Sequence, residues 1–248
     1  MKKYILGNFK MNMTLKETEA YIEGFLPLVK DSKNEIVIFP SYTNLLFASQ
    51  KLTASKVLLG AQNVHAEPNG AYTGEVSGQM LKSVGAKYVL VGHSERRKYF
   101  YEKNDQINKK IKEALGQGLK VVLCIGETKY ERQNKKYKQV LQKDVQEALK
   151  GLYENELKNI IIAYEPIWSI GTGKLPSAKE IEQAASIIRA QIQTEYSEKA
   201  AKSIKVLYGG SINLQNAKTF ADIKSINGLL VGGASLVLEE FAKICNIQ

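Results

Sequence analysis

The apolar positions of the chain fall into eight short runs, most of them rich in β-branched residues. Within each run apolar residues follow one another instead of alternating with polar ones, which is typical of parallel strands covered on both faces. The eight predicted strands are Tyr4 to Phe9, Glu35 to Phe39, Val57 to Ala61, Tyr88 to Val91, Lys120 to Cys124, Ile160 to Tyr164, Lys205 to Tyr208 and Gly228 to Val231.

Between these runs, apolar residues return at the three- to four-residue spacing of a helix. One predicted helix has its N-cap at Asp105 and is closed by Gly116 and Gly118, and another runs from Tyr137 to Leu152. Two further helix starts carry the spacing of a capping box, Thr14 with Glu17 and Ser177 with Glu180.

Strands and helices therefore alternate along all 248 residues, without a linker or a low-complexity segment. This order predicts one domain over residues 1–248, a closed α/β barrel of the (β/α)8 type. An open, doubly wound sheet is the alternative.

The composition of the chain limits the cellular location and the partners that we expect. No apolar run approaches the roughly 18 residues of a membrane span, and Cys124 and Cys245 are far apart. We therefore expect no membrane partner and a reducing, cytoplasmic location. The net charge of +10 comes from lysines scattered along the chain, which favours a solvated surface over a nucleic-acid site.

In a barrel of this kind the reactive groups collect where the strands end. The first strand ends in Asn8 and Lys10, whose side chains share a face. Lys10 alone could be an ordinary surface lysine, but at the barrel mouth it offers a fixed positive charge to an anion.

One of only two histidines, His93, follows the fourth strand and precedes a predicted helix. A helix N-terminus disfavours the protonated imidazole, so we expect a neutral ring that donates a hydrogen bond. His65 lies in a polar loop beside Glu67, and we interpret it as structural.

The sixth strand ends at Glu165 and is followed by a segment with a rigid start and a glycine-rich end. This pattern predicts a lid that excludes water while a carboxylate takes a proton. The predicted lid comprises Pro166, Ile167, Trp168, Ser169, Ile170, Gly171, Thr172, Gly173 and Lys174.

Paired glycines follow the last two strands, Gly209 with Gly210 before Ser211, and Gly232 with Gly233. Backbone N–H groups at such positions approach an anion closely, and these loops bind phosphate in many barrels. No metal-ligand cluster, GxSxG elbow or nucleotide fingerprint occurs. We therefore predict acid–base chemistry on a phosphorylated compound, with neither a metal nor a cofactor.

The motifs at the strand ends together resemble those of the triosephosphate isomerases, over essentially the whole chain. They occur in the order and at the spacing of that family: Gly7-Asn8-Phe9-Lys10-Met11-Asn12, Gly92-His93-Ser94-Glu95-Arg96-Arg97, Ala163-Tyr164-Glu165-Pro166-Ile167-Trp168, Tyr208-Gly209-Gly210-Ser211 and Gly232-Gly233.

The resemblance implies interconversion of D-glyceraldehyde 3-phosphate and dihydroxyacetone phosphate, in glycolysis and gluconeogenesis, through an enediolate. By resemblance, Glu165 is the base and His93 the electrophile, while Lys10 and Asn8 stabilise negative charge and Glu95 supports the site. The phosphate is expected to bind backbone N–H groups in the lid and in the last two loops, at Gly171, Ser211 and Gly233, beside Gly232.

The family also implies a homodimer, joined by the long loop from Gln62 to Ser77, which contains Thr73 and Glu75, with Thr73 reaching the partner near Asn8 and Lys10. Three positions depart from the family pattern: Phe9, usually Trp; Tyr101, usually Gly with a possible positive φ; and Asn227, usually Asp and a partner of Arg189. The alternatives are another phosphate-binding barrel, such as a sugar-phosphate epimerase, and a non-catalytic anion-binding protein.

Overall fold

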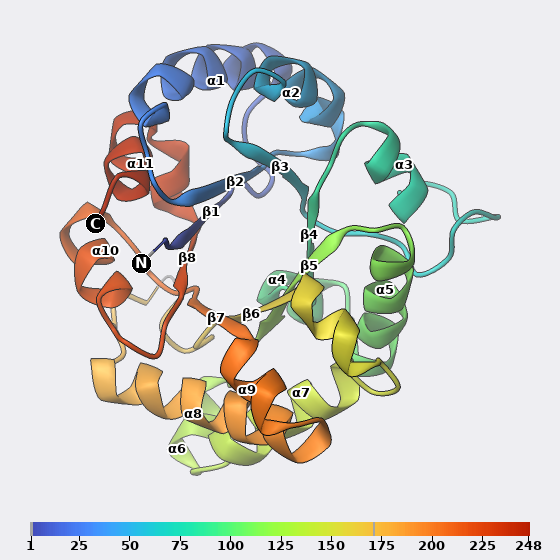
Figure 1. Ribbon diagram of the computed structural model, residues 1–248, viewed down its shortest axis with the longest axis vertical. Helices are drawn as coiled ribbons and strands as arrows, with labels where there is room; N and C mark the ends of the chain where they lie inside the picture. Colours follow the sequence, from blue (N-terminus) through green and yellow to red (C-terminus); the bar gives the residue numbers. More distant parts are fainter. Residues whose placement is uncertain (1, 171) are drawn as a thin grey trace.

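Across residues 2–170 and 172–248, which the computed structural model describes, eight parallel strands close into a barrel in chain order (Figure 1). The barrel closes because β1 pairs with both β2 and β8. The strands are β1 Tyr4–Asn8, β2 Glu35–Phe39, β3 Leu58–Ala61, β4 Tyr88–Val91, β5 Lys120–Ile125, β6 Ile160–Tyr164, β7 Lys205–Tyr208 and β8 Gly228–Val231.

The predicted fold class is confirmed, and the open sheet is wrong. Five strands have the predicted bounds, and the other three differ by one residue at one end. β1 stops at Asn8 rather than Phe9, β3 begins at Leu58 rather than Val57, and β5 continues to Ile125. Continuous apolar runs become strands here because both faces of the barrel wall are covered.

Helices form the outer ring of the barrel (Figure 1). Within the described residues they are α1 Leu15–Val29, α2 Leu45–Leu52, α3 Gly78–Ser83, α4 Ser94–Tyr99, α5 Asn104–Gly116, α6 Lys129–Gln133, α7 Tyr137–Ala148, α8 Ala178–Glu195, α9 Glu198–Ser203, α10 Leu214–Ala221 and α11 Leu238–Cys245, with short 3₁₀ turns η1 Tyr42–Asn44, η2 Glu154–Asn159 and η3 Gly233–Leu236. None of these helices is long and apolar enough to cross a membrane.

Both predicted capping boxes are present, at the starts of α1 and α8. The predicted N-cap at Asp105 is wrong, because α5 begins at Asn104 with Lys103 as its N-cap. The Gln106 side chain accepts from the Lys103 backbone N–H at 3.1 Å, which caps the helix two residues earlier than predicted. α7 ends at Ala148, short of Leu152, and the chain then turns through Gly151 at φ +75°.

The core has two layers, separated by the barrel wall. Side chains such as Leu6, Leu90 and Leu230 fill the barrel interior, while their neighbours in the strands pack outward against the helices. Cys124 belongs to the interior layer and is fully buried, as expected for a packed structural residue. Because apolar side chains fill the interior, polar groups can gather only beyond it, at the carboxyl ends of the strands.

Candidate active site

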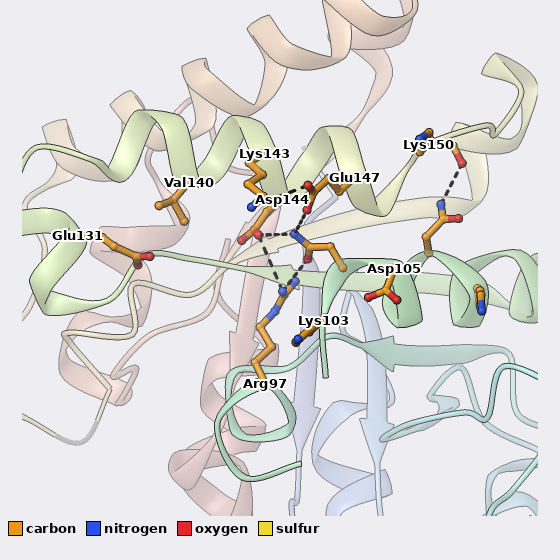
Figure 2. Close-up of a pocket in the computed structure, with 12 residues that line it drawn as sticks. Arg97, Lys103, Asp105, Glu131, Val140, Lys143, Asp144, Glu147 and Lys150 are labelled. Carbon is orange, nitrogen blue, oxygen red and sulfur yellow. Dashed lines mark hydrogen bonds and ion pairs between the residues drawn. The ribbon is translucent and has the colours of Figure 1, made fainter. Parts of the chain in front are cut away.

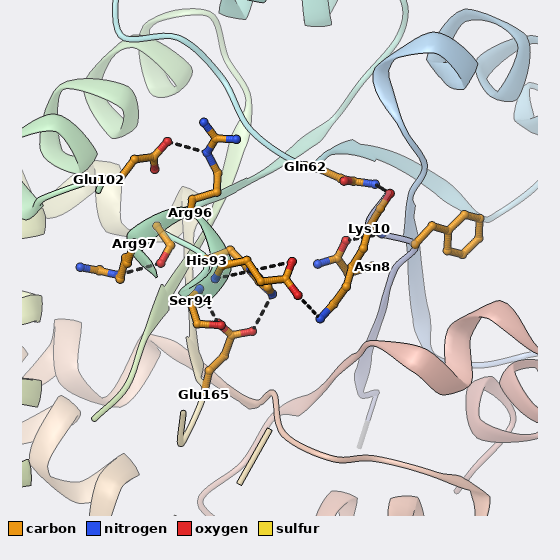
Figure 3. A network of polar contacts seen from close by, with 12 residues as sticks. Asn8, Lys10, Gln62, His93, Ser94, Arg96, Arg97, Glu102 and Glu165 are labelled. Atoms are coloured by element: carbon orange, nitrogen blue, oxygen red, sulfur yellow. Dashed lines mark hydrogen bonds and ion pairs between the residues drawn. The ribbon is translucent and has the colours of Figure 1, made fainter. Parts of the chain in front are cut away.

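The polar residues predicted from the strand ends meet at one mouth of the barrel (Figure 3). Asn8 ends β1, His93 follows β4 by two residues and Glu165 follows β6 directly. All three side chains are buried. Parallel strands in a closed barrel bring these segments together although they are far apart in sequence.

Lys10 reaches the same mouth through an unusual backbone turn. Its φ is +53°, in the left-handed region, and its N–H donates to the Asn8 side-chain oxygen at 3.0 Å. The Lys10 Nζ donates to the Glu95 Oε1 at 2.7 Å. Gln62 holds this turn in place, because its Nε2 donates to the carbonyls of Lys10 and Phe39, each at 2.8 Å.

His93 and Glu165 form a direct contact inside the site. The His93 Nε2 lies 3.3 Å from the Glu165 Oε1, and the Ser94 N–H donates to the Glu165 Oε2 at 3.3 Å. On the other side of the ring, His93 Nδ1 accepts from the Glu95 N–H at 3.3 Å, as the N-cap of α4. An imidazole that accepts at Nδ1 carries its proton at Nε2, facing the carboxylate.

The charges of this pair are strongly coupled. Burial lowers the pKa of His93, but the Glu165 carboxylate, assisted by Glu95, outweighs burial and holds the pKa above its ordinary value. For Glu165, burial raises the pKa, while His93, the Ser94 N–H and Lys10 together hold it below its ordinary value. The helix N-terminus favours the neutral form of His93, whereas the nearby Glu165 carboxylate favours the protonated form. The neutral form therefore stays a prediction.

The predicted lid segment borders these groups through Ile170. Ile170 lines a cavity of about 30 Å³ together with Asn8, Lys10, His93, Glu165, Gly209, Gly210, Leu230 and Gly232. Such a volume holds only one or two water molecules. The predicted lid residue Gly171 lies outside the described residues.

Two hydrogen bonds hold the described part of the predicted lid segment. The Trp168 Nε1 donates to the Glu127 Oε1 at 2.8 Å, and the Ser211 Oγ donates to the Ser169 carbonyl at 2.8 Å. Ser211 thereby joins the lid to the loop after β7. These contacts must break or shift if a ligand larger than the cavity is to enter.

The glycine-rich loops after β7 and β8 border the same cavity. A Cβ on Gly232 would lie 3.6 Å from the Lys10 side chain, and one on Gly209 would lie 3.1 Å from the Glu165 side chain. At Gly233 the space that a Cβ would occupy is open. Backbone therefore approaches the charged groups closely, as an anion site requires.

Several residues of the site carried no recognised signal in the sequence. Gln62 lies in a long loop, and Gly126 is needed because a Cβ there would lie 1.8 Å from the Glu165 carbonyl oxygen. The fully buried Glu127 accepts from both Trp168 and Tyr164, and burial raises its pKa. Gly126 and Glu127 directly follow β5, so the rule applied to the other strand ends would have found them.

Arg97 stabilises the ends of two strands next to the site. Its Nε donates to the Gly92 carbonyl at 2.8 Å and its Nη2 to the Cys124 carbonyl at 3.2 Å, which ties the ends of β4 and β5 together. Its other side borders a groove of about 770 Å³ between α5 and α7, where Nη1 contacts Asn104 (Figure 2). Charges of both signs line this groove.

The loop predicted to form the dimer contact projects away from the barrel (Figure 1). Thr73 and Glu75 are both exposed. Glu75 lies 3.3 Å from the His65 Nδ1, and Tyr72 packs on the His65 ring at 4.2 Å between centroids. His65 thus has the structural surroundings expected of it.

A family model for triosephosphate isomerase matches residues 3–248. The chain belongs to the triosephosphate isomerase family. Among similar proteins, it is 43% identical over 242 residues to the triosephosphate isomerase of Thermoanaerobacter pseudethanolicus, covering 98% of both chains. It is 45% identical over 244 residues to that of Dictyoglomus thermophilum, again covering 98% of both, and 41% identical over 242 residues to that of Clostridium botulinum, with the same coverage.

The three departures from the triosephosphate isomerase pattern are accommodated. Phe9 is fully buried and packs edge-on against Tyr21 at 5.0 Å. Tyr101 has the positive φ anticipated for a glycine position, +56°. The Asn227 Oδ1 accepts from the Arg189 guanidinium at 3.2 Å, so a neutral hydrogen bond is present at this position.

Proposed function

We propose that the chain interconverts D-glyceraldehyde 3-phosphate and dihydroxyacetone phosphate, a step of glycolysis and gluconeogenesis, by metal-free proton transfer through an enediolate. The observation that carries this proposal is the convergence of Lys10, His93 and Glu165 on one cavity bordered by the glycine-rich loops. Membership of the triosephosphate isomerase family supports it.

Glu165 is the proposed base. In the ligand-free site His93, the Ser94 N–H and Lys10 hold the pKa of Glu165 below its ordinary value, so the carboxylate is ionised when substrate arrives. Leaving His93 and the Ser94 N–H raises that pKa, which makes the carboxylate a stronger base toward carbon. In the ligand-free site both oxygens are engaged, by His93 and by the Ser94 N–H. Substrate must draw the carboxylate from these contacts, after which the proton passes from one carbon to its neighbour by way of Glu165.

His93 is the proposed electrophile, donating from Nε2 to the substrate oxygens. When Glu165 turns toward substrate, the largest contribution that raises the pKa of His93 is removed, while burial and Lys10 continue to lower it. The Glu95 N–H at Nδ1 keeps the donor at Nε2. Substrate binding thus favours the neutral, donating ring.

Lys10 and Asn8 stabilise the negative charge that develops on the enediolate oxygens. The Lys10 ammonium is held by Glu95 in the free site, so it is already directed along the mouth. The carboxylate of Glu95 also orients Lys10 without occupying the cavity.

For the phosphate we propose backbone N–H donors from the lid at Gly171 and from Ser211 and Gly233, beside Gly232. The close approach of these loops to Lys10 and the open space at Gly233 support this assignment. Because Ile170 of the proposed lid lines the cavity beside Glu165, the lid moves aside to admit substrate and then closes. Closure keeps water from the enediolate.

We further propose a cytoplasmic homodimer. The projecting loop exposes Thr73 and Tyr72, and large apolar side chains such as Met11, at 96% exposure, and Phe100, at 63%, lie uncovered at the same end of the barrel. Such surfaces favour association. Both cysteines are free and buried, which suits a reducing compartment.

The decisive experiment measures turnover of glyceraldehyde 3-phosphate with a metal chelator present, for the wild type and for Glu165→Asp and His93→Gln. Glu165→Asp withdraws the carboxylate by about 1 Å, which should cost about a hundredfold. Loss of the His93 donor should cost about a hundred- to a thousandfold. Glu182→Asp, an exposed change on α8, is the matched control and should leave turnover unchanged.

Absence of turnover in folded wild type would refute the proposal and favour a non-catalytic anion-binding protein. Turnover of pentose phosphates that the chelator abolishes would favour the epimerase. Within residues 2–170 and 172–248 there is no cluster of three or more His, Cys, Asp or Glu side chains able to hold a metal ion.

A further inference from the structure

The positive charge of the molecule is concentrated at the end of the barrel opposite the active site. We define the basic face as the segments that lead into the strands there, residues 2–3, 30–35, 53–57, 84–87, 117–120, 149–159, 196–205 and 222–227. These segments hold 13 lysines and 6 carboxylates, a surplus of seven, whereas the chain as a whole has a net charge of +10. About a fifth of the residues thus carries most of the charge.

The lysines of the basic face form a ring. Every strand begins with a lysine or follows one by at most four residues: Lys3, Lys33, Lys56, Lys87, Lys120, Lys158, Lys205 and Lys224, from β1 to β8. Because all eight strands are parallel in a closed barrel, their first residues surround the barrel axis at one end. Along the sequence the same lysines are scattered, so their clustering depends on the fold.

Most of this charge is available to a partner. Eleven of the 13 lysines are exposed, and Lys3 and Lys205 are partly buried. In the described part of the chain, Lys2 and Lys120 share Glu35, and Lys202 pairs with Glu198. The remaining lysines of the basic face form no ion pair among these residues.

The composition of the face indicates how it would recognise a partner. Its cations are all lysines, and its segments contain no arginine. Tyr153 is the one large aromatic side chain that is strongly exposed among their described residues. Arginine forks and stacking aromatics give phosphate- or base-specific recognition, so this face suits diffuse attraction to a dense, extended array of negative charge.

The geometry distinguishes between extended anions. A rod-like duplex meets a ring of charge only along one strip, whereas a flat anionic surface meets the whole ring at once. We propose that the basic face docks the protein reversibly on an anionic lipid surface, with the active-site mouth pointing away from the lipid and open to substrate. This proposal replaces the sequence-based expectation of no membrane partner, which rested on the lack of a spanning apolar run and did not address attachment to a membrane surface.

Attraction of this kind is electrostatic and additive. Each lysine near an anionic bilayer contributes roughly a fivefold gain in partitioning. The attraction is screened over about 10 Å at 0.1 M salt. Without an inserted or lipidated segment it stays reversible.

The test is flotation of the full chain with vesicles of phosphatidylcholine containing 30% phosphatidylglycerol, at low and at high salt. The face variant carries Lys33→Glu, Lys56→Glu, Lys87→Glu and Lys158→Glu. The control carries the same change in net charge at exposed helix positions, Lys16→Glu, Lys129→Glu, Lys138→Glu and Lys179→Glu. Isomerase turnover and unfolding curves verify that both variants are folded.

We expect wild type and control to bind anionic vesicles at low salt, to release them at high salt and to ignore pure phosphatidylcholine. The face variant should bind at least about five-hundredfold more weakly, because four attractive charges of roughly fivefold each are lost, with normal turnover. Equal losses in both variants would show that net charge alone matters and would overturn the proposal. So would no vesicle binding by the wild type, including the case in which duplex DNA binds through the same four lysines.

Discussion

The two ends of the barrel differ in which types of residue adopt the left-handed backbone conformation. Among the described residues, the four non-glycine residues in the left-handed region are Lys10, Met13, Tyr101 and Lys135. They lie in the connections from β1 to α1, from β4 through α4 to α5, and from β5 through α6 to α7, at the active-site end. At the opposite end the corresponding turns before β4, β5 and β6 use Gly85, Gly118 and Gly151. In the described residues, backbone strain at non-glycine positions therefore occurs at the active-site end, whereas glycines avoid it in these turns at the opposite end.

Polar side chains also have different roles at the two ends. At the active-site end, His93 and Glu165 are buried against each other beside a cavity. At the opposite end, Asn227 joins three strands, since its backbone carbonyl accepts from Tyr4 and its side-chain oxygen accepts from Val206. Changes at the first end should therefore reduce activity, and changes at the second should reduce stability.

The largest expected effect comes from Lys10→Met. Removing the ammonium that faces the developing oxyanion should reduce kcat/KM by about a hundred- to a thousandfold. Stability should hardly change, because the Lys10–Glu95 pair is partly exposed and such pairs contribute little. Steady-state kinetics and urea unfolding check both parts. A variant that loses stability in proportion to activity would break the contrast between the ends.

Asn227→Ala tests the opposite end. The substitution leaves the Val206 N–H and the half-buried Arg189 guanidinium without their acceptor, which should lower the free energy of unfolding by about 1–3 kcal/mol. Turnover per folded molecule should be unchanged. Asn227→Asp is the matched control, because it keeps the acceptor and adds a charge opposite Arg189. Comparable destabilisation by both changes would contradict this account.

A smaller effect, of opposite sign, is expected from Tyr101→Gly. Tyr101 is 79% exposed at a φ of +56°, so glycine relieves strain at little cost in packing and should raise stability by roughly 0.5–1 kcal/mol. Tyr153 is 77% exposed at a φ of −83°, and Tyr153→Gly should lower stability by a similar amount. If the two glycines shifted the unfolding midpoint in the same direction, strain at Tyr101 would not be the cause.

The sequence was sufficient to predict the barrel and the residues at five of its strand ends. Apolar runs and helix spacing reflect burial and local geometry, which a single chain displays directly. The error at Asp105 arose because several polar residues compete to cap one helix start, and only the contact between Gln106 and Lys103 decides it.

Other features depend on contacts between distant segments. Gln62 reaches the carbonyl of Lys10 across 52 positions of sequence, and no local pattern marks it. The sequence pattern does not predict the ring of lysines for the same reason, because the ring forms only when the fold brings the starts of eight strands together. The effect of Glu165 on the pKa of His93 likewise requires a distance between two strand ends.

The smallest expected effect is a change in the pH dependence of kcat/KM caused by Glu95→Gln, because nearby carboxylates raise the pKa of His93. The Glu95 carboxylate helps to raise the pKa of His93, and the proposed mechanism needs the neutral ring. Removing this charge lowers the pKa of His93, so the acid limb of kcat/KM should move to lower pH. The glutamine keeps an oxygen for Lys10, and Glu67→Gln, an exposed change in the projecting loop, is the control. A limb that stayed in place or moved to higher pH would mean that His93 is not the group whose protonation stops the reaction.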